Sequence, residues 1–170
     1  MKNWTLLLLV IVAIASRFII VAGPAWANFS PLGALALYAG YNYFWKGWIA
    51  TAVAVVLSNM VINNVLYSQY YDGFSWGIDA NMLIFVLISV MGQFKSEKVL
   101  SINIAASLIF FVLSNALVWS GTMYTHDMKG LIECYTAALP FYGNTILSQF
   151  IFGGLFYGIH RTVQKYALVI

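Results

Sequence analysis

Two side chains in this sequence have the types needed for covalent catalysis. Cys134 and His126 lie in one polar segment, where an imidazole can act as the base for a thiol nucleophile. No third residue that would orient the imidazole is evident, and nothing in the spacing indicates that the two side chains meet. Together with Glu133 they match no metal-ligand pattern, and no glycine-rich phosphate loop is present. We therefore predict a protein that is not an enzyme and that holds no metal or cofactor.

Amide side chains inside apolar runs are more informative. Asn59 and Asn63 stand four residues apart, on one face of a helix, and Asn115 and Trp119 do the same further along. Asn103, Ser107 and Ser114 follow an adjoining helical stripe. In a membrane such groups face the bundle interior or a wet cavity. They either hydrogen-bond across helices or, for Asn115 and Trp119, form part of a pocket wall.

The elements that position these residues are predicted to be membrane helices. Hydrophobic residues make up 62% of the 170 residues and charged residues 8%, against about 25% charged in soluble domains. We expect an all-α, polytopic membrane protein, a six-helix bundle in one domain over residues 1–170. The predicted spans are 4–22, 32–44, 48–67, 79–94, 99–119 and 144–161, with an interfacial or re-entrant helix over 130–139 that Pro140 ends.

Charge sorting predicts the orientation of these spans. With the N-terminus inside, one side carries Lys2, Lys46, Lys95, Lys98, Arg161 and Lys165. The loops of the other side contain only Lys129. Lysine and arginine are enriched in cytoplasmic loops. We therefore expect a protein of the cell (inner) membrane with both termini in the cytoplasm. The net charge of +3 is too small and too dispersed to indicate nucleic acid.

A cleaved signal peptide is the alternative at the N-terminus. Ala25-Trp26-Ala27 resembles a cleavage site. The apolar run, however, continues to Ala22 with Arg17 inside it, and Pro24 precedes the site. These features favour a retained first helix.

Arg17 is the only firmly charged residue well inside a predicted span. It is expected to snorkel outward or to pair with Asp79 or Glu133. Small residues one turn apart permit close helix contact, either within the bundle or with another membrane subunit. These pairs are Ala36-x-x-x-Gly40, Ala50-x-x-x-Ala54 and Gly154-x-x-x-Gly158.

The segments predicted on the outer side are long, aromatic and rich in amides. They cover residues 23–31, 67–81 and 120–143, whereas the inner turns are short and basic. Aromatic residues at this depth form an interfacial belt in many membrane proteins. Long loops of this composition also suit a lid over a medium-sized, partly apolar ligand.

Three motifs carry a resemblance to a known family. They are Asn28-Phe29-Ser30-Pro31-Leu32-Gly33-Ala34, Phe110-Phe111-x-x-Ser114-Asn115-x-x-x-Trp119 and Cys134-Tyr135-x-x-Ala138-Leu139-Pro140-Phe141. From about residue 17 to residue 158 the chain resembles an uncharacterised bacterial membrane protein family. That family is related to the S components of energy-coupling factor (ECF) vitamin transporters.

The resemblance implies a mechanism. S components capture a vitamin or metal from outside and dock on a membrane coupling subunit driven by two ATP-binding subunits. Their first helix usually carries an Ala-x-x-x-Ala docking motif, where this chain has Ala13-Ile-Ala-Ser-Arg17. This departure leaves a solitary transporter open, including a cobalamin type with Cys134 on the cobalt.

The sequence thus predicts a substrate-binding component of an ECF-type importer for a small vitamin-like molecule. The alternative is a structural or assembly subunit of a membrane complex, without a small ligand. The predicted substrate-binding residues are Asn28, Ser30, Asn115, Trp119, Cys134, Tyr135 and Asn144.

Overall fold

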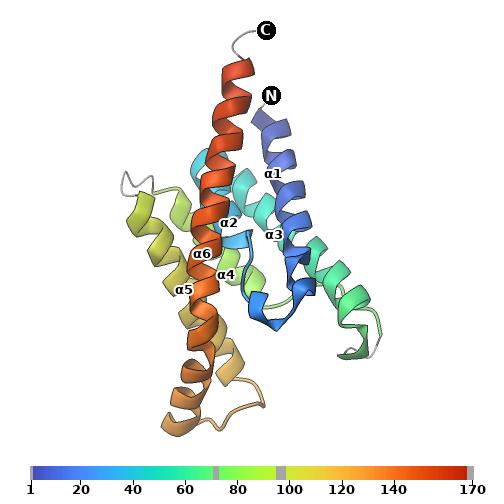
Figure 1. The fold of residues 1–170 in the computed structure, drawn as a ribbon, viewed down its shortest axis with the longest axis vertical. Helices are drawn as coiled ribbons and strands as arrows, with labels where there is room; N and C mark the ends of the chain where they lie inside the picture. Colours follow the sequence, from blue (N-terminus) through green and yellow to red (C-terminus); the bar gives the residue numbers. More distant parts are fainter. Residues whose placement is uncertain (1, 71–72, 95–98, 168–170) are drawn as a thin grey trace.

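The computed structural model describes residues 2–70, 73–94 and 99–167, and helices are the only regular secondary structure in these ranges (Figure 1). Six of the helices are α-helices. Their bounds are α1 Lys2–Ser16, α2 Leu32–Tyr43, α3 Trp45–Val61, α4 Asn81–Gly92, α5 Val99–Trp119 and α6 Met128–Ala167. Lys95 and Lys98, two of the cations assigned to the inner side, lie outside the described residues.

Helix α2 is the centre of the bundle. It contacts all five other α-helices, and eight of its twelve residues are buried. At 1.5 Å per residue it is about 18 Å long, too short to cross a bilayer core of about 30 Å. Its alanines and leucines instead pack against protein on every side, as in the core of Leu32, Leu35 and Ala36.

Glycine permits the closest helix contact, between α2 and α4. A Cβ atom at Gly40 of α2 would overlap the backbone carbonyl of Ser89, and one at Gly92 of α4 would overlap that of Leu37. The two helices therefore meet backbone to backbone, as small residues allow in membrane bundles. The predicted internal packing is confirmed for Ala36 and Gly40, and Ala54 is also buried. Gly154 and Gly158 are exposed, with open space beside them.

Helix α6 differs from the prediction. Residues 130–139 do not form a separate helix ended by Pro140, because α6 runs without interruption for 40 residues and holds Pro140 in its interior. Proline removes one helical hydrogen bond, that to the carbonyl of Thr136, and its ring crowds the preceding turn. Both Thr136 and Pro140 lie on the exposed side of the helix. The helix is about 60 Å long, roughly twice the thickness of a bilayer core.

The structure has helices at the other predicted spans, and their bounds agree to within a few residues. The last turns of the first and third predicted spans are the exceptions. The first predicted span becomes 3₁₀ from Arg17 to Ala22, and the third ends in a π-helical turn over Ile62–Leu66. By length and composition, Trp45–Leu66 and Ser101–Trp119 are long and apolar enough to cross a membrane. Trp4–Ile19 and Asn81–Gly92 are apolar but shorter.

The N- and C-terminal ends of the chain lie at the same end of the bundle (Figure 1). The segments before α2, between α3 and α4, and between α5 and α6 lie toward the opposite end, and the α5–α6 hairpin extends furthest (Figure 1). We call the end with the termini proximal and the opposite end distal.

Candidate functional site

A cavity of about 580 Å³ occupies the distal half of the bundle. Its walls come from the 3₁₀ segment that follows α1, the segment before α2, the segment between α3 and α4, and parts of α3, α4, α5 and α6. Cavities of 300–1,000 Å³ are typical of small-molecule sites. We call it the distal cavity.

Amide and hydroxyl groups dominate the polar lining of the distal cavity, and aromatic rings form most of its bulky apolar surface. The amides and hydroxyls belong to Asn28, Ser30, Asn59, Asn63, Asn81, Ser107, Ser114, Asn115, Thr145, Ser148 and Gln149. The rings belong to Trp26, Phe29, Tyr67, Phe85 and Phe110, of which Phe85 and Phe110 stack at 5.0 Å between centroids.

The ionisable lining residues Arg17 and Asp79 are joined through Asn59. The Arg17 guanidinium donates to Oδ1 of Asn59 and, at 2.7 Å, to Oγ of Ser58. The Asn59 amide donates in turn to Oδ2 of Asp79 at 2.9 Å and to the carbonyl of Gly77 at 3.2 Å. Arg17 therefore reaches Asp79 through an intervening amide, and we call these three residues the Arg17–Asn59–Asp79 relay. The other predicted partner, Glu133, lies 3.9 Å from Lys129.

The segment between α3 and α4 folds back onto α3 next to this relay. Asn64 donates to the Ser75 carbonyl and accepts from its amide, at 2.6 and 2.9 Å, and Asn63 donates to Oγ of Ser75 at 3.0 Å. Gly77 has φ +72° and presses against the backbone at Val56 and Met60, a position that only glycine fits. The asparagines of the π-helical turn after α3 thus hold this segment against that helix.

The segment before α2 carries Asn28 and Ser30, two of the predicted substrate-binding residues, and both line the cavity. Asn28 adopts φ +62°, which asparagine tolerates better than most residues, and Oγ of Ser30 accepts from the amide of Leu32 at 3.3 Å. Asn144 does not line the cavity. Its amide donates to the carbonyls of Ala25 and Ala27 at 2.7 and 2.9 Å. It ties α6 to the segment that carries Asn28.

Asn115 lines the cavity from α5, together with Ser114. The amide nitrogen of Asn115 donates to the carbonyl of Phe111 at 2.7 Å, one turn earlier in the same helix. This bond fixes the side-chain orientation within the wall.

Three of the predicted site residues lie elsewhere, in the α5–α6 hairpin. Trp119 donates to the carbonyl of Thr125 at 3.0 Å, Tyr135 donates to that of Val112 at 2.6 Å, and Sγ of Cys134 lies 3.5 Å from that of Asn115. None of the three lines the distal cavity. They hold the hairpin together instead.

The thiol of Cys134 has no catalytic environment among the described residues. Its side chain is 2% exposed, and burial raises the pKa of the thiol, which keeps it protonated at neutral pH. His126 instead lies at the tip of the hairpin, with Nε2 2.8 Å from the carbonyl of Gly121. In the described ranges no three histidine, cysteine, aspartate or glutamate side chains group as metal ligands.

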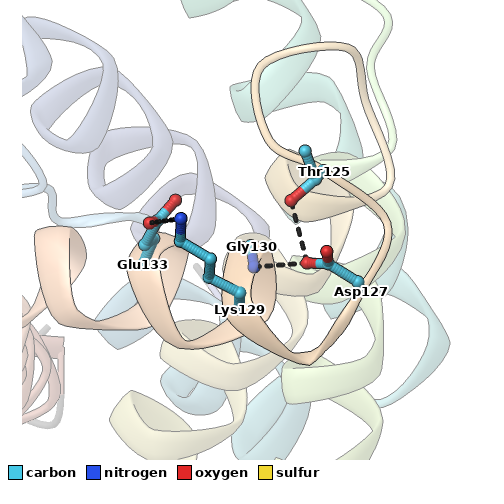
Figure 2. A network of polar contacts seen from close by, with 5 residues as sticks. All are labelled: Thr125, Asp127, Lys129, Gly130 and Glu133. Atoms are coloured by element: carbon cyan, nitrogen blue, oxygen red, sulfur yellow. Dashed lines mark hydrogen bonds and ion pairs between the residues drawn. The ribbon is translucent and has the colours of Figure 1, made fainter.

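Asp127 caps the N-terminus of α6 (Figure 2). Its Oδ1 accepts from the amide of Gly130 and from Oγ1 of Thr125, both at 2.8 Å. The Gly130 bond, followed by the Thr125 bond, holds the pKa of Asp127 below its ordinary value. A carboxylate is favoured at this end of the helix by the backbone amides that point toward it.

We expect Asp127→Ala to increase amide hydrogen exchange over residues 128–132, because the first turn of α6 loses its cap. Lowering the pH should decrease the protection factors of the same amides in the unchanged protein, when each exchange rate is compared with the intrinsic rate at that pH. Since the folded-state pKa is depressed, the contribution is complete above the unfolded pKa and is lost as the pH falls through the folded one. Exchange measured by mass spectrometry tests both. Glu133→Gln is the control, because its ion pair with Lys129 is solvent-exposed and should contribute little (Figure 2). An equal increase in the control would contradict the capping role.

Gln149 forms the floor of the distal cavity. It is 3% exposed, and its amide donates to Oδ1 of Asn103 at 3.1 Å. A second cavity of about 740 Å³ begins on the other side of this pair and also includes Gln149 in its lining. We call it the proximal cavity. Sequence reasoning did not single out Gln149, although a glutamine in the apolar run of 145–157 is the kind of signal that identified Asn59.

Comparison with known proteins places the chain in a family without assigning it an activity. No curated protein and no solved structure matches it. The model of a family of unknown function, DUF6580, matches residues 1–169, and the chain belongs to this family.

Proposed function

We propose that this protein is a membrane-embedded substrate-binding component of the S-component type, with six spans and both termini in the cytoplasm. It captures a small vitamin-like molecule in the distal cavity from the outer side of a cell membrane. The observation that carries the proposal is the distal cavity itself, a space of ligand size lined by amides, hydroxyls and aromatic rings. It lies at the end of the bundle that carries the long connecting segments (Figure 1).

The chemistry of the cavity favours a ligand of low net charge. Arg17 and Asp79 carry opposite charges and are bridged by Asn59, so their fields largely cancel. The remaining polar groups donate and accept single hydrogen bonds, which recognise ring nitrogens, amides and hydroxyls. The stacked Phe85 and Phe110 rings suit a flat apolar face. A neutral or zwitterionic molecule with a planar ring fits these features.

Recognition of a cobalt centre by Cys134 has no support in this arrangement, because the buried thiol does not line the cavity. The proposal therefore relies on amides and aromatic rings. The partner proposed for it is a membrane coupling subunit with two ATP-binding subunits, and a solitary transporter is the alternative.

An assembly subunit is the second candidate function. It is favoured by Gly154 and Gly158, which lie one turn apart on an exposed stretch of α6 without a protein neighbour. Small residues exposed in this way allow close approach of another membrane helix. Stable co-purification of another membrane protein, with no retained small molecule, would favour this function over transport.

The transport proposal predicts that the protein, purified in mild detergent, retains a small molecule that native mass spectrometry detects. Asn115→Ala should weaken binding of that molecule about tenfold or more, because a polar partner in the cavity wall is lost. Asn42→Ala is a matched control, since Asn42 likewise donates to the carbonyl one turn earlier, that of Tyr38, but lines the proximal cavity. Cys134→Ser should leave affinity unchanged. Equal losses in Asn115→Ala and Asn42→Ala would contradict the assignment of the distal cavity.

A further inference from the structure

The proximal cavity has a composition unlike that of the distal one. It lies between α2, the end of α4, the start of α5 and the second half of α6, and its volume is about 740 Å³. Asn103 and Gln149 close it toward the distal cavity. Apart from this pair its inner part is largely apolar, and further polar side chains lie at the end nearer the chain termini.

The apolar part has room for a flexible chain. Leu37, Ile102 and Phe150 line it, together with Gly153 and Gly154. A Cβ atom added at Gly154 would meet nothing within 4 Å, and one at Gly153 would meet only Oδ1 of Asn103 at 3.6 Å. The two glycines therefore leave this part of the cavity wide.

The polar end carries a positioned cation. Nε of Arg161 donates to the hydroxyl of Tyr157 at 2.8 Å, and its guanidinium lies 5.2 Å from the centre of the same ring. The terminal nitrogens of a guanidinium held in this way form the fork that binds phosphate oxygens. Tyr41, Asn42 and His160 line the same end.

Of the residues that the structure describes, none with an acidic side chain lines the proximal cavity. Among the described residues, Asp79 lines the distal cavity, and Asp127 and Glu133 lie in the α5–α6 hairpin. Among the described lining residues, Arg161 therefore gives the polar end a positive charge, beside a largely apolar space. An anion attached to an apolar chain complements both halves, whereas a free phosphate would leave the apolar half unfilled.

We propose that the proximal cavity binds one anionic phospholipid. An acyl chain occupies the apolar part beside Gly153 and Gly154, and the phosphate pairs with Arg161. This proposal does not depend on the proposed substrate site, because within the described ranges the linings of the two cavities share Gln149 alone.

Native mass spectrometry of the delipidated full chain tests this proposal. The probes are phosphatidylglycerol and phosphatidylcholine with identical acyl chains, titrated separately. We expect phosphatidylglycerol to bind about tenfold more tightly than phosphatidylcholine, because one charge-assisted contact contributes about that much. Arg161→Gln should abolish this preference, while Lys165→Gln, one turn further along α6 and outside the cavity lining, should keep it. Equal binding of the two lipids, or an equal loss in both variants, would overturn the proposal.

The acyl-chain half of the site is tested separately, in a protein that keeps Arg161. Gly154→Leu places a side chain in the apolar part and should lower phosphatidylglycerol binding about tenfold, because it removes the volume of several methylene groups. Gly158→Leu adds the same side chain one turn away, outside the cavity lining, and should leave binding unchanged. Inorganic phosphate at the same concentration should not compete with the lipid. Unchanged binding in Gly154→Leu, or competition by phosphate alone, would show that the cavity does not hold the lipid chain.

Discussion

Gly40→Ala should destabilise the protein more than any other single methyl addition in the bundle. The new Cβ would overlap the backbone carbonyl of Ser89, which cannot rotate away as a side chain can, so α2 and α4 must separate. Overpacking of this kind costs about 3 kcal/mol. Because α2 contacts every other α-helix, the separation should reach the whole core. Thermal unfolding in detergent should show a Tm about 10 °C lower.

Gly158→Ala is the control for this prediction. Gly158 is exposed on α6 with nothing within 4 Å of its added Cβ, and alanine has the higher helix propensity. Its Tm should stay the same or rise slightly. If Gly40→Ala left the Tm unchanged, the backbone contact between α2 and α4 could not be the one described.

Helix bounds were predicted correctly where the local sequence sets them, and wrongly where packing against other helices sets them. Apolar length predicted α5 with its observed bounds, and the predicted second span starts at Leu32, the first residue of α2. Pro140 was misleading because its effect depends on context. Its cost of about 3 kcal/mol in a helix interior is offset when both halves of the helix pack, and here Tyr135 and Gln149 each bond to α5 on either side of it.

The candidate site was predictable only in part, for a related reason. Asn28, Ser30 and Asn115 line the distal cavity as expected, because polar groups in apolar surroundings must face an interior space. Trp119 and Cys134 carry equally suggestive chemistry, but the continuation of α6 past Pro140 places them inside a hairpin. Which polar residues share a cavity is decided by helix continuity and register, which no local motif encodes.

Removal of the amide at Asn59 should have the second largest effect. Asn59→Leu keeps the side-chain volume. It removes both the oxygen that accepts from Arg17 and the nitrogen that donates to Asp79. Both charged partners then lose a hydrogen bond in a partly buried setting, at a cost of about 3 kcal/mol. We expect a lower Tm and loss of the retained small molecule. Asn63→Leu, one turn away, removes only a bond to Oγ of Ser75 and should cost about 1 kcal/mol. Equal losses in both variants would contradict a special role for the relay.

Asn59→Asp separates the two halves of the relay. The new carboxylate still accepts from Arg17, so the contact between the end of α1 and α3 remains. It cannot donate to Asp79 or to the Gly77 carbonyl, and it places a like charge beside Asp79. Hydrogen exchange should therefore increase over residues 73–83 and stay unchanged over residues 17–22, whereas Asn59→Leu should increase both. An increase at residues 17–22 in Asn59→Asp would mean that Asp79, rather than Asn59, holds Arg17 in place. The expected pattern, in which exchange increases only in the segment before α4, would show that Asn59 connects the two walls of the distal cavity.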